Sequence, residues 1–157
     1  LEEVNGWDER FITSQDSELS MRLLDAGYSL YRSPDPTVSM VKRTSLKQWW
    51  RMGHRYGFWR TKVLLKHPKR TNMVEFLPFF GLILLAALFI GGLEMWWLPI
   101  PVYGVVLMIE GIRHGFRAGS MSSCVGVPLC LVMLHTSFTL GLADGLVRKG
   151  RPPKDRK

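Results

Sequence analysis

The sequence has few cysteines, no acidic residue between positions 36 and 74, and no cluster spaced like metal ligands. The two cysteines, Cys124 and Cys130, lie at the edge of and inside an apolar stretch, a context that excludes a cysteine metal site and does not favour a disulfide framework. No Asp or Glu occurs from residue 36 to residue 74, where ten lysines and arginines fall. The net charge of +8 over 157 residues is therefore concentrated in one basic block that follows an acidic beginning.

The chain also lacks an initiating methionine and a recognisable signal peptide. Leu1 stands directly before a motif-like segment, and we therefore expect the chain to be the C-terminal portion of a longer protein. Its mean hydropathy of +0.04 averages a polar first third and an apolar second half. Such a composition does not suit one soluble domain, although the length would allow it.

Residues 1–44 are typical of the end of an α/β domain. A helix is predicted over residues 16–26, because apolar residues recur there at helical spacing. Gly27 follows as a left-handed C-cap. Short strands are expected at residues 28–31 and 37–41, on either side of a turn that contains two prolines.

Residues 45–66 are predicted to form one or two amphipathic helices, with Ser45 as the N-cap. Cationic side chains recur there every four or seven residues and share one stripe, namely Lys47, Arg51, Arg55, Lys62 and Lys66. A basic stripe on a tryptophan-rich helix is typical of the membrane interface, where each cation gains roughly 1 kcal/mol beside anionic headgroups. The alternative is a solvated basic face on a soluble helix. Nucleic-acid binding is not favoured, because apolar segments follow.

Three apolar segments follow, at residues 76–98, 102–112 and 125–146. At about 1.5 Å per residue the first and third can cross a hydrocarbon core of roughly 30 Å, whereas the second barely spans it. His135 lies inside the third segment, where we expect an interhelical hydrogen bond. The positive-inside rule places the basic block in the cytoplasm, yet the tail at residues 148–157 is basic too, which argues against an odd number of crossings.

Ordered motifs in the first seventy residues carry a family resemblance. They are Gly6-Trp7-Asp8-Glu9, Gln15-Asp16-Ser17-Glu18-Leu19, Arg22-Leu23 and Ala26-Gly27-Tyr28. This series resembles the end of the GT-A catalytic domain of family 2 glycosyltransferases. The continuation is similar to the bacterial membrane-anchored subgroup that includes succinoglycan-type exopolysaccharide glucosyltransferases, in Arg43-Thr44-Ser45-Leu46, Arg51, Arg55-Tyr56-Gly57-Phe58-Trp59 and Lys66-His67-Pro68. The last apolar segment, with Gly141 and Gly145, resembles the final helix of that subgroup.

The resemblance implies a mostly α fragment with four parts. The C-terminal edge of a GT-A α/β catalytic domain is expected at residues 1–44, and basic, Trp-rich interfacial amphipathic helices at 45–74. A small transmembrane bundle of two or three helices is expected at 75–147, before a basic tail at 148–157. The implied location is the cell inner membrane, as a multi-pass protein whose catalytic part is cytoplasmic.

The resemblance also assigns the residues of an inverting transfer of a hexose. Asp16 is expected to be the general base that takes the proton of the attacking hydroxyl, or else only the N-cap of its helix. Gln15 offers an amide to a sugar hydroxyl. Glu18 is expected to hold the acceptor, to pack, or only to pair with the helix dipole. Trp7 is expected to be a sugar platform or a packing residue.

Arg51 and Arg55 are expected to face the leaving diphosphate or a lipid-linked phosphate, or else to bind only headgroups. Met52 and Gly53 depart from the family pattern between them. The implied cofactor of the full-length enzyme is Mg²⁺ or Mn²⁺ on an Asp-x-Asp motif that this chain lacks, so no metal ligand is expected here. The implied partners are a nucleotide-sugar donor, a lipid-linked or polysaccharide acceptor and membrane phospholipid, with no nucleic acid. The rival interpretation is a non-catalytic membrane anchor that only binds lipid.

Overall fold

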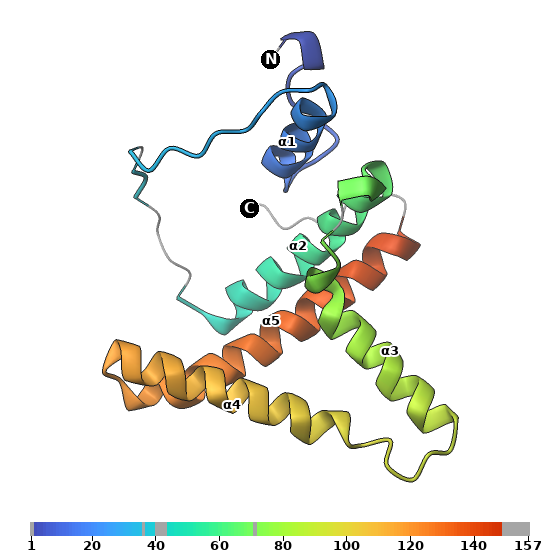
Figure 1. Ribbon diagram of the computed structural model, residues 1–157, viewed down its shortest axis with the longest axis vertical. Coiled ribbons are helices and arrows are strands. Elements are labelled where there is room, and N and C mark those ends of the chain that lie inside the picture. Colours follow the sequence, from blue (N-terminus) through green and yellow to red (C-terminus); the bar gives the residue numbers. More distant parts are fainter. Residues whose placement is uncertain (1, 36, 40–43, 71, 149–157) are drawn as a thin grey trace.

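The computed structural model describes residues 2–35, 37–39, 44–70 and 72–148 (Figure 1). Within these residues every regular element is a helix, which confirms the mostly α fold class. The long helices are α1 (Gln15–Asp25), α2 (Leu46–Lys66), α3 (Leu77–Ile90), α4 (Pro99–Ala118) and α5 (Met121–Val147). The short 3₁₀ turns are η1 (Glu2–Val4), η2 (Pro68–Arg70) and η3 (Met73–Phe76).

α1 lies within one residue of the predicted helix at each end. Gly27 follows it with a φ of +89°, the left-handed conformation expected of a glycine cap. The strand expected at residues 28–31 is wrong, because a strand is stable only when its backbone groups pair with a neighbour, and the described residues include no strand to pair with. Of the strand expected at residues 37–41, positions 40 and 41 lie outside the described residues, and 37–39 form none.

α2 is one uninterrupted helix of 21 residues, and it packs along α5 (Figure 1). Ser45 caps it as predicted, because its hydroxyl accepts a hydrogen bond from the backbone N–H of Gln48 at 3.3 Å. Phe58, Trp59 and Val63 are buried on it, and Phe11 packs against Trp59 with ring centroids 5.4 Å apart. The residues before α1 are thereby docked on the C-terminal half of α2.

α2 and α5 run parallel and touch through small residues. A Cβ built on Gly57 would stand 2.1 Å from the carbonyl oxygen of Phe138, and one built on Gly141 would stand 2.1 Å from the carbonyl oxygen of His54. Gly53 faces Ser137 in the same way, with an added Cβ 2.0 Å from its Oγ. Small residues four apart let two helix backbones approach closely. Glycine is therefore required at this crossing for space.

α3 is shorter than the hydropathy of its segment predicts. The first apolar segment was expected to cross a membrane as one helix over residues 76–98, and this is wrong, because α3 ends at Ile90 and Gly92 has a φ of +67°. Its 14 residues cover about 21 Å at roughly 1.5 Å per residue, which is short of a hydrocarbon core of about 30 Å. The glycine pair at 91–92 ends α3, because glycine adopts left-handed conformations at little cost.

α4 is longer than expected and leads back to α5. Pro99 lies in its first turn, where a missing N–H group costs nothing. The C-terminal half of α4 packs on the N-terminal half of α5, and a Cβ added to Gly111 would stand 2.3 Å from the carbonyl oxygen of Cys124. The Tyr103 hydroxyl and His135 Nδ1 lie 2.7 Å apart, which confirms the interhelical hydrogen bond predicted for His135. α3, α4 and α5 thus form the three sides of a triangle (Figure 1).

Candidate active site

Asp16 stands on the surface at the start of α1 and lines a hollow of about 550 Å³. The hollow is lined by two hydroxyls, two apolar side chains and two cations besides the carboxylate, namely Ser17, Ser20, Met21, Leu24, Arg60 and Lys69. The N-cap of α1 is Ser14, so the alternative that Asp16 only caps the helix is wrong. Its exposed carboxylate therefore faces the solvent beside two positive charges.

Arg60 is held in this hollow by an acidic partner. Its Nε lies 2.7 Å and its Nη2 lies 2.8 Å from the two carboxylate oxygens of Glu75 in η3. A two-pronged pair of this kind orients the planar guanidinium group. Arg60 therefore keeps a fixed direction beside Asp16 and offers its remaining N–H groups to a ligand.

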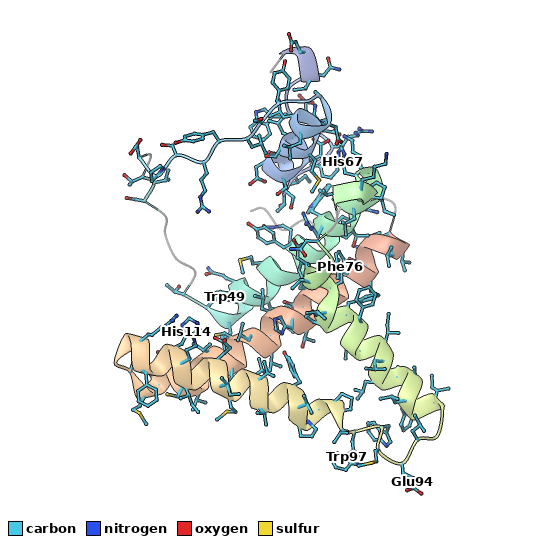
Figure 2. The ribbon with its side chains drawn as sticks, in the orientation of Figure 1. Trp49, His67, Phe76, Glu94, Trp97 and His114 are labelled. Carbon is cyan, nitrogen blue, oxygen red and sulfur yellow. The ribbon has the colours of Figure 1, made fainter. Side chains whose placement is uncertain are left out.

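Glu18 is fully buried and ties α1 to the end of α2. Its carboxylate lies 2.9 Å from Arg22 on α1, 2.5 Å from Lys66 on α2, and 3.3 Å from the ring of His67. Burial alone would raise the pKa of Glu18, but the hydrogen bonds from Arg22, Lys66 and His67 outweigh it, and the pKa lies below its usual value. Figure 2 shows His67 beside α1, where Asp25 lies 3.3 Å from its other ring nitrogen.

The loop before α1 joins the same network through Asp8. The hydrogen bond from Arg10 chiefly holds the pKa of Asp8 well below its usual range. Burial opposes this shift, and Lys66, 2.8 Å away, adds to it. Arg22 donates to the carbonyl oxygens of Val4 and Gly6 from the other side. The motif residues that are far apart in the sequence therefore meet in one charged cluster (Asp8, Glu18, Arg22, Lys66, His67), which we call the anchoring cluster.

The structure does not bring the other predicted site residues into the hollow with Asp16. The amide of Gln15 donates to the carbonyl oxygen of Phe11. Trp7 is half exposed, and the carboxylate of Glu18 is already paired within the anchoring cluster. Arg51 lies exposed on the N-terminal half of α2. Arg55 is half-buried on the same helix, and its Nε is buried without a hydrogen-bond partner.

Sequence reasoning missed Arg60 and Lys69 as neighbours of Asp16. Both belong to the basic block, and neither stands on the stripe of regularly spaced cations. No local signal marks them, because the packing of α1 on α2 decides which cations face the carboxylate. The motif Lys66-His67, by contrast, was visible in the sequence, and the structure now gives it a physical role as the partner of Glu18.

The described part of the chain contains no group of three His, Cys, Asp or Glu side chains that could hold a metal ion. The divalent ion that the resemblance implies therefore has no ligand set among these residues. In the hollow itself the one carboxylate of Asp16 is accompanied by hydroxyls and cations, a poor donor set for a hard dication.

Comparison with known proteins relates the chain to glycosyltransferases. It is 27% identical over 142 residues to a dolichyl N-acetyl-alpha-D-glucosaminyl phosphate 3-beta-D-2,3-diacetamido-2,3-dideoxy-beta-D-glucuronosyltransferase of Methanococcus voltae, a match covering 90% of this chain and 42% of that protein. It is 32% identical over 75 residues to the succinoglycan biosynthesis protein ExoA of Rhizobium meliloti, covering 48% of this chain and 23% of that protein. A pre-mycofactocin glycosyltransferase of Mycobacterium tuberculosis is 31% identical over 71 residues, covering 45% and 15%.

The chain spans less than half the length of each of these relatives. No protein-family model and no solved structure matches it. The relatives nevertheless agree in kind, because two of them are named as sugar transferases and the third as a succinoglycan biosynthesis protein. The chain is therefore a relative of glycosyltransferases, and the resemblance seen in its sequence is confirmed.

Proposed function

We propose that the chain is the C-terminal part of a membrane-bound inverting glycosyltransferase, in which Asp16 is the general base. The transferred group would be a hexose from a nucleotide sugar, and the acceptor a lipid-linked or polysaccharide hydroxyl. The observation that carries this proposal is the hollow in which the exposed Asp16 stands beside Arg60 and Lys69. The anchoring cluster supports it, because Glu18, two residues further along α1, fixes that helix to α2.

The reaction needs one proton acceptor and a stabilised leaving group. The acceptor oxygen forms a bond to the anomeric carbon while the bond from that carbon to the diphosphate breaks, and the hydroxyl proton passes to the Asp16 carboxylate. Ser17 and Ser20 offer hydroxyls that can orient a sugar. The two cations add positive charge where a phosphate of the donor or of the acceptor would lie.

A phosphate-bearing acceptor is favoured by the first of the relatives. The name of the Methanococcus voltae protein describes action on a dolichyl-linked sugar phosphate. Arg55 offers a further donor for such a phosphate, because its buried Nε lacks a partner. Arg51 is exposed one turn before it and suits either the same phosphate or a lipid headgroup. A divalent ion bound by the donor half of the full-length enzyme would neutralise the diphosphate.

The test is sugar transfer by the full-length protein with Asp16→Asn, measured in membrane vesicles with a labelled nucleotide sugar and a polyprenyl-phosphate-linked acceptor. A general base contributes about 10²- to 10⁴-fold, so we expect the rate to fall by at least about 100-fold. Asp35→Asn is the matched control, because Asp35 is exposed and lies outside the hollow. A rate for Asp16→Asn close to that of the control would refute the assignment of the base.

The second candidate is a lipid-binding anchor without catalysis. The exposed cations Lys47 and Arg51 on α2 and the apolar surface of α3 and α4 favour it. Sedimentation with membranes separates the two functions, since Asp16→Asn should leave membrane binding unchanged while it abolishes transfer. We place the catalytic part in the cytoplasm at the inner membrane, in agreement with the positive-inside rule.

A further inference from the structure

α5 alone among the described helices is long and apolar enough to cross a membrane. We propose that it nevertheless lies along the cytoplasmic surface of the bilayer, and that the arm formed by α3 and α4 is the part that enters the lipid. This inference rests on the membrane association in the proposed function. The supporting observations are the contacts that the two ends of α5 make with α2 and α4.

The C-terminal end of α5 is held by α2, the helix that also carries α1. Lys62 Nζ donates to the carbonyl oxygens of Gly145 at 2.7 Å and of Arg148 at 2.6 Å. A cation on the last carbonyl groups of a helix is favourable, because the helix dipole places partial negative charge there. One turn further along α2, Lys66 binds Glu18 of α1. The end of α5 is therefore on the same side of the membrane as the candidate active site.

The N-terminal end of α5 is packed against the polar end of α4. Gly115 lies so close to Cys124 that an added Cβ would stand 2.2 Å from the Sγ atom. The last turns of α4 bring a cluster of ionisable side chains to this corner, namely Glu110, Arg113, His114 and Arg117. Figure 2 shows His114 at this corner of the triangle, far from the apex. A corner rich in arginine is expected on the cytoplasmic side.

The pairing with α2 gives a second reason why α5 does not cross. Gly53 faces Ser137 and Gly57 faces the turn of Phe138 and Leu142, so the two helices advance together along a common direction. If α5 crossed the bilayer, α2 would have to follow it into the hydrocarbon. α2 carries exposed cationic side chains along its length, including Lys47 and Arg51. Placing them in hydrocarbon is strongly unfavourable.

The arm of α3 and α4 has the opposite character. α3 starts beside the end of α5, where Phe76, Phe79 and Phe80 line a cavity of about 280 Å³ together with Leu142 and Leu146. From Leu77 to Ile109 the arm carries one charged residue, Glu94, and most of its large apolar side chains are exposed. Trp96 and Trp97 stand with Glu94 at the apex, and Figure 2 shows Trp97 and Glu94 there. Such a surface fits lipid.

The triangle therefore has charged side chains at both ends of its base and an apolar apex. Its base is α5, with α2 alongside, and both ends of the arm return to this base (Figure 1). The chain enters and leaves the lipid on one side, so the basic block at residues 42–70 and the basic tail at 148–157 share the cytoplasmic side. This removes the conflict that three crossings would create between these two basic segments.

The test is the side from which the two ends of α5 react with a membrane-impermeant maleimide. The full-length protein is first freed of its other cysteines, with Cys124→Ala and Cys130→Ala among the changes. It then carries either Ser122→Cys or Val147→Cys, at the two ends of α5. A third variant, Lys47→Cys, reports the side on which α2 lies. Each is labelled in inside-out and in right-side-out vesicles, and retained sugar transfer shows that the variant is folded.

We expect both ends of α5 to be labelled in inside-out vesicles and neither in right-side-out vesicles, as for Lys47→Cys. Labelling of Ser122→Cys and Val147→Cys from opposite sides would overturn the inference, and so would protection of either one in both kinds of vesicle. These results are independent of the catalytic proposal, which fails only if Asp16→Asn retains transfer. A protein that stays in the supernatant would contradict the membrane association itself.

Discussion

The close approach of α2 and α5 makes a sharp prediction for Gly57→Ala. The added Cβ would stand 2.1 Å from the carbonyl oxygen of Phe138 and 2.9 Å from the backbone nitrogen of Leu142. Backbone atoms cannot turn aside, so the helices must move apart by more than about 1 Å to restore ordinary contact. Overpacking costs about 1–3 kcal/mol, and separation weakens the hydrogen bond from Thr61 to Leu142, at 3.0 Å, by about 1 kcal/mol more.

Alanine also favours the helix by about 1 kcal/mol relative to glycine, which offsets part of this cost. We expect a net destabilisation of about 1–3 kcal/mol, measured as a lower midpoint of thermal unfolding for the full-length protein in detergent. The matched control is Gly104→Ala, because Gly104 is in the interior of α4 and nothing lies within 4 Å of its added Cβ. That control should be stabilised by up to about 1 kcal/mol. If both variants shift in the same direction, the tight crossing does not exist in solution.

Three further predictions concern the anchoring cluster and the hollow. Glu18→Gln should cost about 1.5–3 kcal/mol, because a fully buried carboxylate loses its charged hydrogen bonds to Arg22 and Lys66. The exposed Asp35→Asn should cost less than about 0.5 kcal/mol in the same unfolding assay. Folding lowers the pKa values of Asp8 and Glu18. The stabilisation that these two carboxylates contribute is therefore complete above the usual carboxyl pKa of about 4 and is lost as the pH falls below it. Limited proteolysis between α1 and α2 should accordingly accelerate below about pH 4. A cleavage rate that does not change down to pH 3 would contradict this linkage. Lys69→Ala should raise the KM for a phosphate-bearing substrate by about 10-fold with little change in kcat, whereas the control Lys47→Ala should leave KM unchanged. If the two variants change KM equally, Lys69 does not belong to the site.

Local features of the fold were predictable, because they depend on neighbouring residues. The spacing of apolar residues predicted α1, and Ser45 was recognisable as the cap of α2. The end of α3 was missed, because hydropathy stays high through the glycine pair at 91–92 that stops the helix. The strand expected at 28–31 failed for a different reason, since it depends on a partner that is not among the described residues.

The site was predictable only in part. Motif order singled out Asp16, and whether it acts as the base is still a prediction. The position of its neighbours Arg60 and Lys69 depends on how α1 packs on α2, and no periodicity encodes that packing. Glu18 and Lys66 are 48 residues apart, so their pairing at 2.5 Å could not be read from spacing either. What the sequence offered was the presence of both residues in recognisable motifs.

The continuity of α2 sets a length scale for the substrate. This helix of 21 residues is about 32 Å long at roughly 1.5 Å per residue, and it continues without a break from its contacts with α5 to its contact with α1. In the proposed arrangement α2 lies alongside α5 on the bilayer surface and its C-terminal end holds α1, so the position of Asp16 relative to the lipid is fixed. An acceptor anchored in the bilayer must then carry its hydroxyl at that position. The enzyme would then select acceptors by the distance between their lipid anchor and their reactive sugar.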